Sequence, residues 1–197
     1  MVFIIAGNDY ADEEFTLLSK HLNLLDAELE RINTAIKNSR DLDTDELFDS
    51  AEYFIGFGLI AIQKYIASTF PRAGLSKKEA LKLPPAIKDD LTVIEALNAG
   101  ANYMKHYEEW GLHIDVSHNP NSVAERLKKI TIIKNSNILE EPAKTTVITI
   151  EKITPWADYT CVKLLAELLP NKEMKLSALL THIAEWRKNL MVHPSTP

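Results

Sequence analysis

Hydrophobic residues recur every three or four positions near the start of the chain, over residues 15–36. This period is that of an α-helix with one buried face. Acidic residues fill the expected first turn and Lys37 stands near the end, where the helix dipole favours these charges. The pattern predicts an amphipathic helix over about residues 12–39.

A second segment, residues 47–68, is hydrophobic on almost every side. A helix of this kind belongs at the centre of a fold rather than on its surface. Gly56, Gly58 and Ala61 lie within it, and their small size allows a neighbouring helix to approach closely. We therefore expect residues 47–68 to form a central helix.

Further helix signals follow in the rest of the chain. A short Lys-rich helical turn is expected over residues 76–85, and Thr92 is placed to cap a helix that runs to Trp110. Two more helices are expected over residues 156–169 and 176–190.

Between the helices that end at Trp110 and begin near Pro155, β-branched residues dominate two short runs, 130–133 and 145–150. Such runs are typical of strands. The sequence therefore predicts a mainly α fold, a helical bundle of about five helices with an inserted β-hairpin. We expect the chain to form a single domain over residues 1–197, in which residues 123–153 are the hairpin insertion.

Composition limits the cellular compartments and the kinds of partner to be expected. The chain has 46% hydrophobic and 25% charged residues and a single cysteine, Cys161, so no disulfide can form within it. No stretch reaches the roughly 18 apolar residues that a membrane span needs, and we expect a cytoplasmic protein with no membrane partner. The net charge of −6 is uneven: residues 1–53 sum to −9 and residues 54–197 to +3. Clustered cations for an RNA ligand are therefore expected only outside the first quarter.

The predicted helix that ends at Trp110 carries the most informative polar residues. Asn98, Asn102 and His106 are four residues apart, so they share one side of the helix, and Glu109 follows near it. Lys105 lies on the neighbouring side of the helix, and Glu109, four residues later, is spaced to form an ion pair with it. An imidazole beside a lysine and an amide can deprotonate a ribose hydroxyl and stabilise a phosphate, without a metal or cofactor. The alternative is a solvated helix face whose amides bond to a neighbouring helix.

The helix order over residues 12–110 and the motif Asn102-Tyr-Met-Lys105-His106 resemble the HEPN superfamily of helical proteins. This resemblance implies a ribonuclease, a toxin or a phage-defence effector that often works as a homodimer. His106 would be the general base or acid, Lys105 would stabilise the phosphate, Asn102 would orient substrate or imidazole, and Asn98 would contact substrate.

The superfamily's signature is an arginine followed several positions later by a histidine. Before His106 those positions hold Ala99, Gly100 and Ala101, so the arginine is absent there. Arg187 and His193 do match the spacing, which makes Arg187 a further candidate for binding substrate.

Two other interpretations remain open at this stage. The bundle could be a noncatalytic interaction module that dimerises through the small residues Gly100 and Ala101 and binds a partner protein through the hairpin. His113, Asp115 and His118 could ligate a divalent cation from a loop, but in an extended segment His118 falls on the other side from His113 and Asp115, which favours solvated loop residues. No Gly-rich phosphate loop, nucleophile elbow or HExxH zinc motif occurs, which excludes the hydrolases built on them.

Overall fold

The fold is mainly helical, as predicted, and its described residues include a short antiparallel hairpin before the first helix and another in the middle of the chain. The computed structural model describes residues 4–6, 9–39, 46–88, 90–110, 141–155, 158–171 and 174–192. Along the chain the elements are β1 (Ile4–Ala6), β2 (Asp9–Ala11), α1 (Glu13–Asn38), α2 (Leu47–Thr69), the 3-10 helix η1 (Phe70–Ala73), α3 (Lys77–Leu81), β3 (Ala86–Lys88), β4 (Leu91–Thr92), α4 (Val93–Trp110), α6 (Glu141–Glu151), α7 (Thr160–Leu168), the 3-10 helix η2 (Leu176–Leu179) and α8 (Leu180–Val192).

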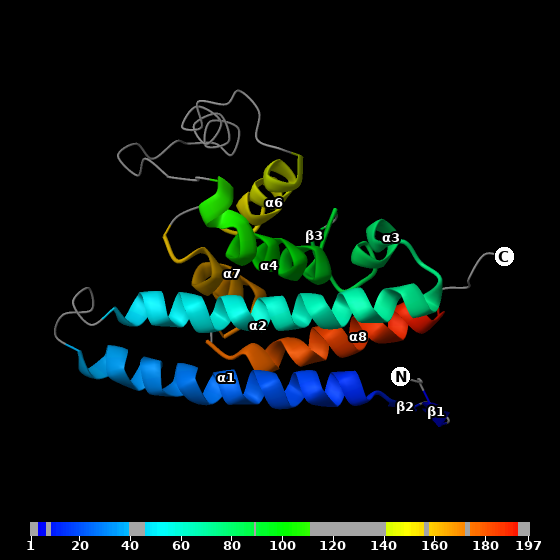
Figure 1. The fold of residues 1–197 in the computed structure, drawn as a ribbon, viewed down its shortest axis with the longest axis horizontal. Coiled ribbons are helices and arrows are strands. Elements are labelled where there is room, and N and C mark those ends of the chain that lie inside the picture. Colours follow the sequence, from blue (N-terminus) through cyan, green and yellow to red (C-terminus); the bar gives the residue numbers. More distant parts are fainter. Residues whose placement is uncertain are drawn as a thin grey trace.

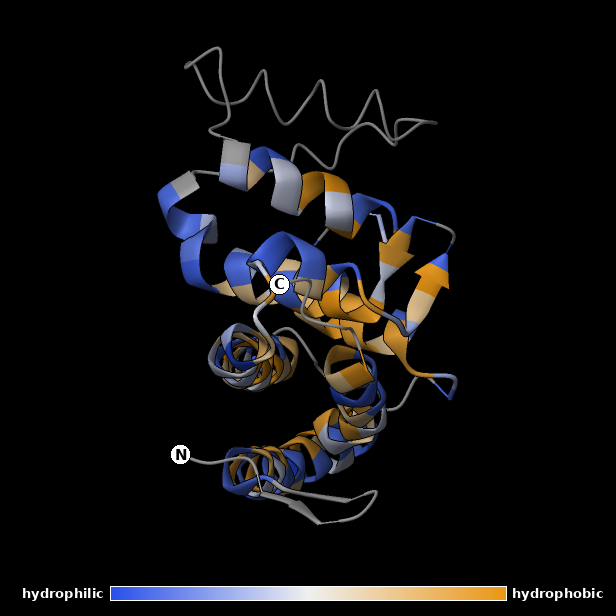
Figure 2. Ribbon diagram, turned by 90° about the vertical axis from the view of Figure 1, so that its right-hand side faces the viewer, coloured by the Kyte–Doolittle hydropathy of each residue, from blue (hydrophilic) through white to orange (hydrophobic). Residues whose placement is uncertain are grey.

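The helices are arranged in layers around α2. Figure 1 shows α1 and α2 antiparallel, with α8 running beside both of them. On the other side of α2 lies α4, which α6 covers from outside, while α7 packs against α2 and α4. In Figure 2 the hydrophobic residues lie on the sides of the helices that face one another. The α2 helix is therefore the centre of the core, as its hydrophobic sequence predicts.

The first helix forms as predicted. Asp12 is its N-cap, and its side chain accepts a hydrogen bond of 3.0 Å from the Phe15 amide. The buried residues of α1 follow the predicted stripe: Leu18, Leu22, Leu29 and Ile32. At its middle, Asp26 accepts hydrogen bonds from the amides of Leu176 and Ser177, which fixes the start of η2 against α1.

The small residues of α2 allow close packing inside the protein. A Cβ atom on Gly56 would lie 2.5 Å from Met104 of α4, and one on Gly58 would clash with Leu176. Gly100 is also buried, and a Cβ there would lie 2.6 Å from Leu164 of α7. Gly100 and the fully buried Ala101 therefore pack within one chain. They therefore provide no surface for the homodimer that was expected to form through them.

The predicted strand over residues 145–150 is wrong, because these residues belong to α6. Ala143, Val147 and Ile150 are buried, and their spacing of four and three is helical. Packing of this face against α4 outweighs the strand preference of the β-branched residues. The inserted hairpin is instead β3–β4, with Lys88 paired to Leu91, directly before α4. The other predicted strand, 130–133, lies outside the described residues.

The remaining helix signals agree with the structure. Thr92 caps α4, since its hydroxyl accepts a hydrogen bond of 3.1 Å from the Glu95 amide. Ser76 and Glu79 form a capping box that starts α3 at Lys77. Among the described residues, none of the helices combines the length and hydrophobicity that crossing a membrane requires.

Candidate functional site: a groove along α4

A groove of about 610 Å³ lies between α3, α4 and α6. It contains two of the predicted site residues, Asn98 and Asn102, which both project from α4. The residues that line it are Lys77, Lys78, Leu81, Lys82, Glu95, Asn98, Ala99, Asn102, Pro142, Thr145, Thr146 and Thr149. Lysines, amides and hydroxyls together make this groove suited to an anion.

Gln63 of α2 fixes how the two asparagines are oriented. Its Nε2 atom donates to Asn98 Oδ1 at 2.9 Å and to Asn102 Oδ1 at 2.8 Å. The same Nε2 lies 3.3 Å from the Asn98 backbone carbonyl, which can only accept a hydrogen bond. The amide nitrogen of Gln63 must therefore face α4, and the side-chain oxygens of both asparagines must face Gln63.

This orientation leaves the two asparagine Nδ2 groups as donors. Within the described part of the chain, no acceptor bonds to either of them. Both residues line the groove, so each Nδ2 can donate to a ligand oxygen there. The side-chain oxygens of both asparagines thus bond to a neighbouring helix, which is the alternative that the sequence left open.

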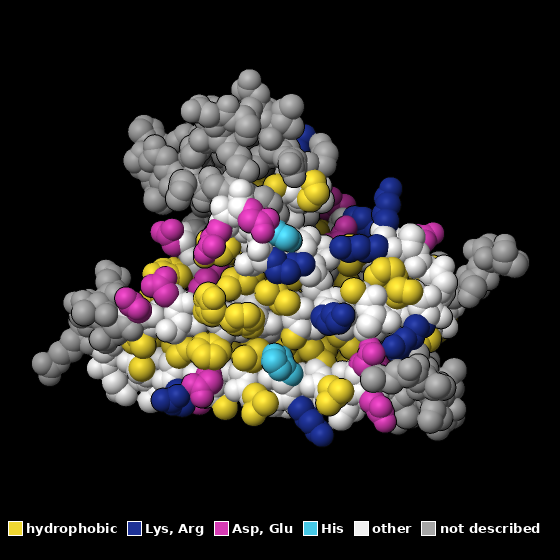
Figure 3. Space-filling model, in the orientation of Figure 1, with side chains coloured by type: hydrophobic (Ala, Val, Ile, Leu, Met, Phe, Trp, Pro, Cys, Tyr) yellow, Lys and Arg dark blue, Asp and Glu magenta, His cyan; other side chains and the backbone are white. Residues whose placement is uncertain are grey.

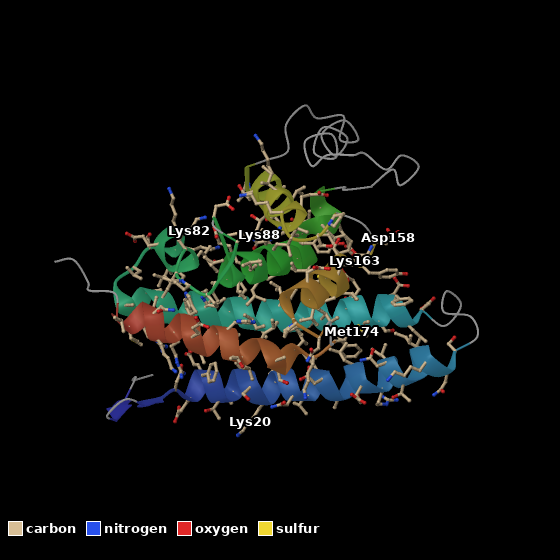
Figure 4. The ribbon with its side chains drawn as sticks, turned by 180° about the vertical axis from the view of Figure 1, so that it is seen from behind. Lys20, Lys82, Lys88, Asp158, Lys163 and Met174 are labelled. Atoms are coloured by element: carbon tan, nitrogen blue, oxygen red, sulfur yellow. The ribbon has the colours of Figure 1, made fainter. Side chains whose placement is uncertain are left out.

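The lysines of α3 supply positive charge. Lys82 is neutralised by Glu95, whose Oε1 lies 2.7 Å from its Nζ. Across the described ranges, no carboxylate pairs with Lys77 or Lys78. Figure 4 shows Lys82 and Lys88 together at the end of the molecule where α4 begins. Among the described residues, Lys77 and Lys78 are therefore the groove lysines whose charge no carboxylate neutralises.

Lys105 extends this positive region along α4. Its pKa is lowered, first by burial and then by the nearby charge of Lys77. The two cations are thus close enough to repel each other, which an anion between them would relieve. No ion pair joins Lys105 to Glu109 in the described structure, contrary to the spacing argument.

Glu109 instead contacts His106. Its Oε2 lies 3.0 Å from His106 Nδ1, and the two side chains are 70% and 41% exposed. A carboxylate at Nδ1 orients the imidazole ring. His106 is one helical turn, about 6 Å along the axis, beyond Asn102. It does not line the groove itself but stands beyond its Asn102 end.

Arg187 is separate from this site. It projects from α8, and its Nη1 pairs with Asp12 Oδ2 at 3.0 Å in a setting where the two side chains are 10% and 3% exposed. Its guanidinium also stacks 4.5 Å from the centre of the Phe15 ring. Tyr65 donates a hydrogen bond of 2.6 Å to the same carboxylate oxygen. This placement gives Arg187 a role in holding α8 to α1 and α2, not in the groove.

Burial alone would raise the pKa of Asp12. Hydrogen bonds from Tyr65 and from the Phe15 amide, together with Arg187, outweigh this effect and hold the pKa below its usual value. Asp12 is therefore ionised at neutral pH, and the pair with Arg187 is a true ion pair.

The sequence alone does not point to two lysines that line the groove or to the glutamine that orients its asparagines. Lys77 and Lys78 belong to the Lys-rich turn expected over residues 76–85, which matches no functional motif. Gln63 gave no signal, because its partners on α4 are 35 and 39 residues away. His193 and the possible cation ligands His113, Asp115 and His118 lie outside the described residues.

The arrangement can hold an anion on fixed amide donors and lysines, with a half-exposed imidazole nearby for proton transfer. Those are the elements of phosphate ester chemistry that needs no metal. Comparison of the chain with protein-family models, curated proteins and solved structures finds no match.

Proposed function

We propose that this protein binds RNA in the α4 groove and cleaves it without a metal ion. One observation carries the proposal: Gln63 turns the amide donors of Asn98 and Asn102 toward a groove whose lysines Lys77 and Lys78 pair with no carboxylate of the described residues. Phosphates of a nucleic-acid backbone bind such donors and cations. The resemblance of the helix order to HEPN proteins implies that the reaction at this anion site is RNA cleavage.

The cleavage step uses the ribose 2′-hydroxyl, which restricts the reaction to RNA. His106 accepts the proton of this hydroxyl, and the 2′-oxygen forms a bond to the adjacent phosphorus. The bond from phosphorus to the 5′-oxygen breaks, and water supplies the proton that this leaving oxygen takes up. The products are a 2′,3′-cyclic phosphate and a 5′-hydroxyl end.

The other residues act on the charge and position of the phosphate. Lys105 lies beside His106 on α4 and stabilises the extra negative charge that develops on the phosphoryl oxygens. Asn102 donates to a phosphate oxygen and so positions the ester relative to the imidazole. Glu109 holds His106 through its Nδ1 and stabilises the imidazolium that forms.

The test of cleavage is an assay of a single-stranded RNA in the presence of EDTA. His106→Ala should abolish cleavage and should lower the free energy of unfolding by less than about 1 kcal/mol, because the imidazole is half exposed. His21→Ala is the matched control, since His21 is exposed on α1, away from the groove. Wild-type protein that cuts no RNA, or a His106→Ala variant that cuts it normally, contradicts the proposal.

We further propose that the cleavage serves a toxin or phage-defence effector, as the resemblance implies. Expression of the wild-type protein in a bacterial host should then slow growth, and His106→Ala should restore it. Equal growth inhibition by both proteins would contradict this role while leaving the cleavage assay to decide the chemistry.

A second candidate function, a noncatalytic module that binds a partner protein or a second copy of the chain, has support from one surface. Figure 3 shows hydrophobic side chains spread over α1 and α2 on one face of the molecule. The exposed hydrophobic side chains of these two helices include Leu17 and Leu24 of α1 and Tyr53 of α2, which are 58%, 70% and 58% exposed. Light scattering of Leu24→Lys and wild type distinguishes the cases: a dimer that this substitution dissociates supports the module, and a monomer contradicts the homodimer.

A further inference from the structure

A second pocket lies at the other end of α4, and half of the residues that line it are tyrosines. It has a volume of about 390 Å³, and four tyrosines line it: Tyr53 of α2, Tyr103 and Tyr107 of α4, and Tyr159 before α7. The rings of Tyr103 and Tyr107 contact each other in a tilted arrangement, with their centroids 5.2 Å apart and their planes at 33°. The pocket therefore offers several ring faces and edges within a small space.

Tyr159 is held in this position by an unusual backbone. Its φ of 59° is in the left-handed region, which a bulky residue rarely adopts. Its ring packs against Phe48 with a centroid distance of 5.3 Å. Backbone conformations of this kind concentrate at binding sites, where the surrounding structure maintains them.

The charged groups of the pocket are all acidic. Asp49, Glu52 and Asp158 line it, and no lysine or arginine of the described chain does. Both oxygens of Glu52 accept backbone hydrogen bonds from the start of α7, at 2.8 Å from the Cys161 amide and 2.9 Å from the Val162 amide. Asp49 and Asp158 are exposed, so they remain available to a ligand.

One cation lies near these carboxylates without lining the pocket. Lys163 acts on the charge of Glu52, and Figure 4 shows it close to Asp158. Burial raises the pKa of Glu52, so among the described groups the negative charge of the pocket comes first from Asp49 and Asp158, which together outweigh the one charge of Lys163.

We propose that this pocket binds an organic ammonium cation, such as a methylated amine or a quaternary ammonium group. Faces of aromatic rings attract a cation, and a cage of several rings suits a bulky, weakly hydrated one. The carboxylates add attraction that a neutral ligand of the same shape does not receive. The site takes a ligand of opposite charge to that of the α4 groove, so it does not depend on the proposed RNA function.

The proposal is tested by titrating the full chain with choline and with 3,3-dimethyl-1-butanol, a neutral molecule of the same shape, by NMR. Choline should bind with a Kd of about 1 mM or below, and the neutral molecule at least about tenfold more weakly. Equal binding of the two, or no saturable binding of choline up to about 10 mM, overturns the proposal.

Two variants locate the site, and a third controls for charge. Tyr107→Leu and Asp158→Asn should each weaken choline binding about threefold or more. Glu30→Gln, which removes an exposed carboxylate from α1, should leave it unchanged. Should Tyr107→Leu fail to fold, as judged by circular dichroism, the exposed Asp158 decides the question. Choline affinity that Asp158→Asn leaves at the wild-type value contradicts the site.

Discussion

The buried ion pair between Asp12 and Arg187 predicts a large loss of stability when one partner is removed. In Asp12→Ala, the guanidinium of Arg187, only 10% exposed, loses the carboxylate that it pairs with. The substitution also removes the N-cap hydrogen bond to the Phe15 amide. Breaking a buried pair from one side costs about 3–5 kcal/mol. We expect Asp12→Ala to lower the free energy of unfolding by about 4 kcal/mol.

This loss is large against the total stability of a domain, about 5–15 kcal/mol. For a chain of this size, it corresponds to a decrease in Tm of about 8–16 °C. Urea unfolding followed by circular dichroism measures it directly. The control is Glu28→Ala, which breaks the pair with Arg31, where the side chains are 42% and 78% exposed. This exposed pair should contribute less than about 0.5 kcal/mol.

The stabilisation by Asp12 also has a defined pH dependence. Its pKa is lower in the folded protein than the ordinary value of 3.8, so the folded state binds fewer protons. The contribution is therefore present above pH 3.8 and is lost as the pH falls through the folded pKa. Asp12→Ala should show a weaker decline of stability in acid than wild type. A variant no less stable than the Glu28→Ala control would refute the account of this cluster.

Two further predictions concern α6 and the groove. Ile150→Ala should cost about 2–5 kcal/mol in the free energy of unfolding, because its side chain is fully buried, whereas Val192→Ala, at 79% exposure, should cost less than about 0.5 kcal/mol; equal costs measured by urea unfolding would mean that α6 does not belong to the core. Lys78→Gln should weaken RNA binding and reduce the slope of log affinity against log salt by about 1, while Lys20→Gln on α1 should leave both unchanged. Fluorescence anisotropy at several salt concentrations measures the slope, and an unaltered slope for Lys78→Gln would show that this lysine touches no phosphate.

Local patterns were sufficient to predict the long helices. The stripe of α1 and the hydrophobic surface of α2 each depend on residues that are close in sequence, so their periodicity shows directly which face is buried. The row Asn98, Asn102, His106 was also predictable, because a helix fixes the spacing of its own side chains.

What could not be predicted depends on contacts between distant parts of the chain. The β-branched residues of α6 favour a strand locally, and packing against α4 favours the helix instead. Arg187 and Asp12 are 175 residues apart, so nothing local shows that this arginine is buried in an ion pair. The role of Gln63 also depends on distant residues, since its partners Asn98 and Asn102 lie 35 and 39 residues away. Local sequence therefore does not show that Gln63 decides which atoms of these amides face the groove.

The orientation of those amides provides the most direct test of the central claim that the α4 groove binds RNA phosphates. In Gln63→Glu, the carboxylate only accepts hydrogen bonds, so Asn98 and Asn102 would turn their Nδ2 groups toward it and present oxygens to the groove. Asn23→Asp, at an exposed position on α1, introduces the same charge away from the site. Fluorescence anisotropy with a labelled single-stranded RNA should give at least about tenfold weaker binding for Gln63→Glu than for Asn23→Asp, with both variants folded by circular dichroism. Equal affinities of the two folded variants would contradict the claim.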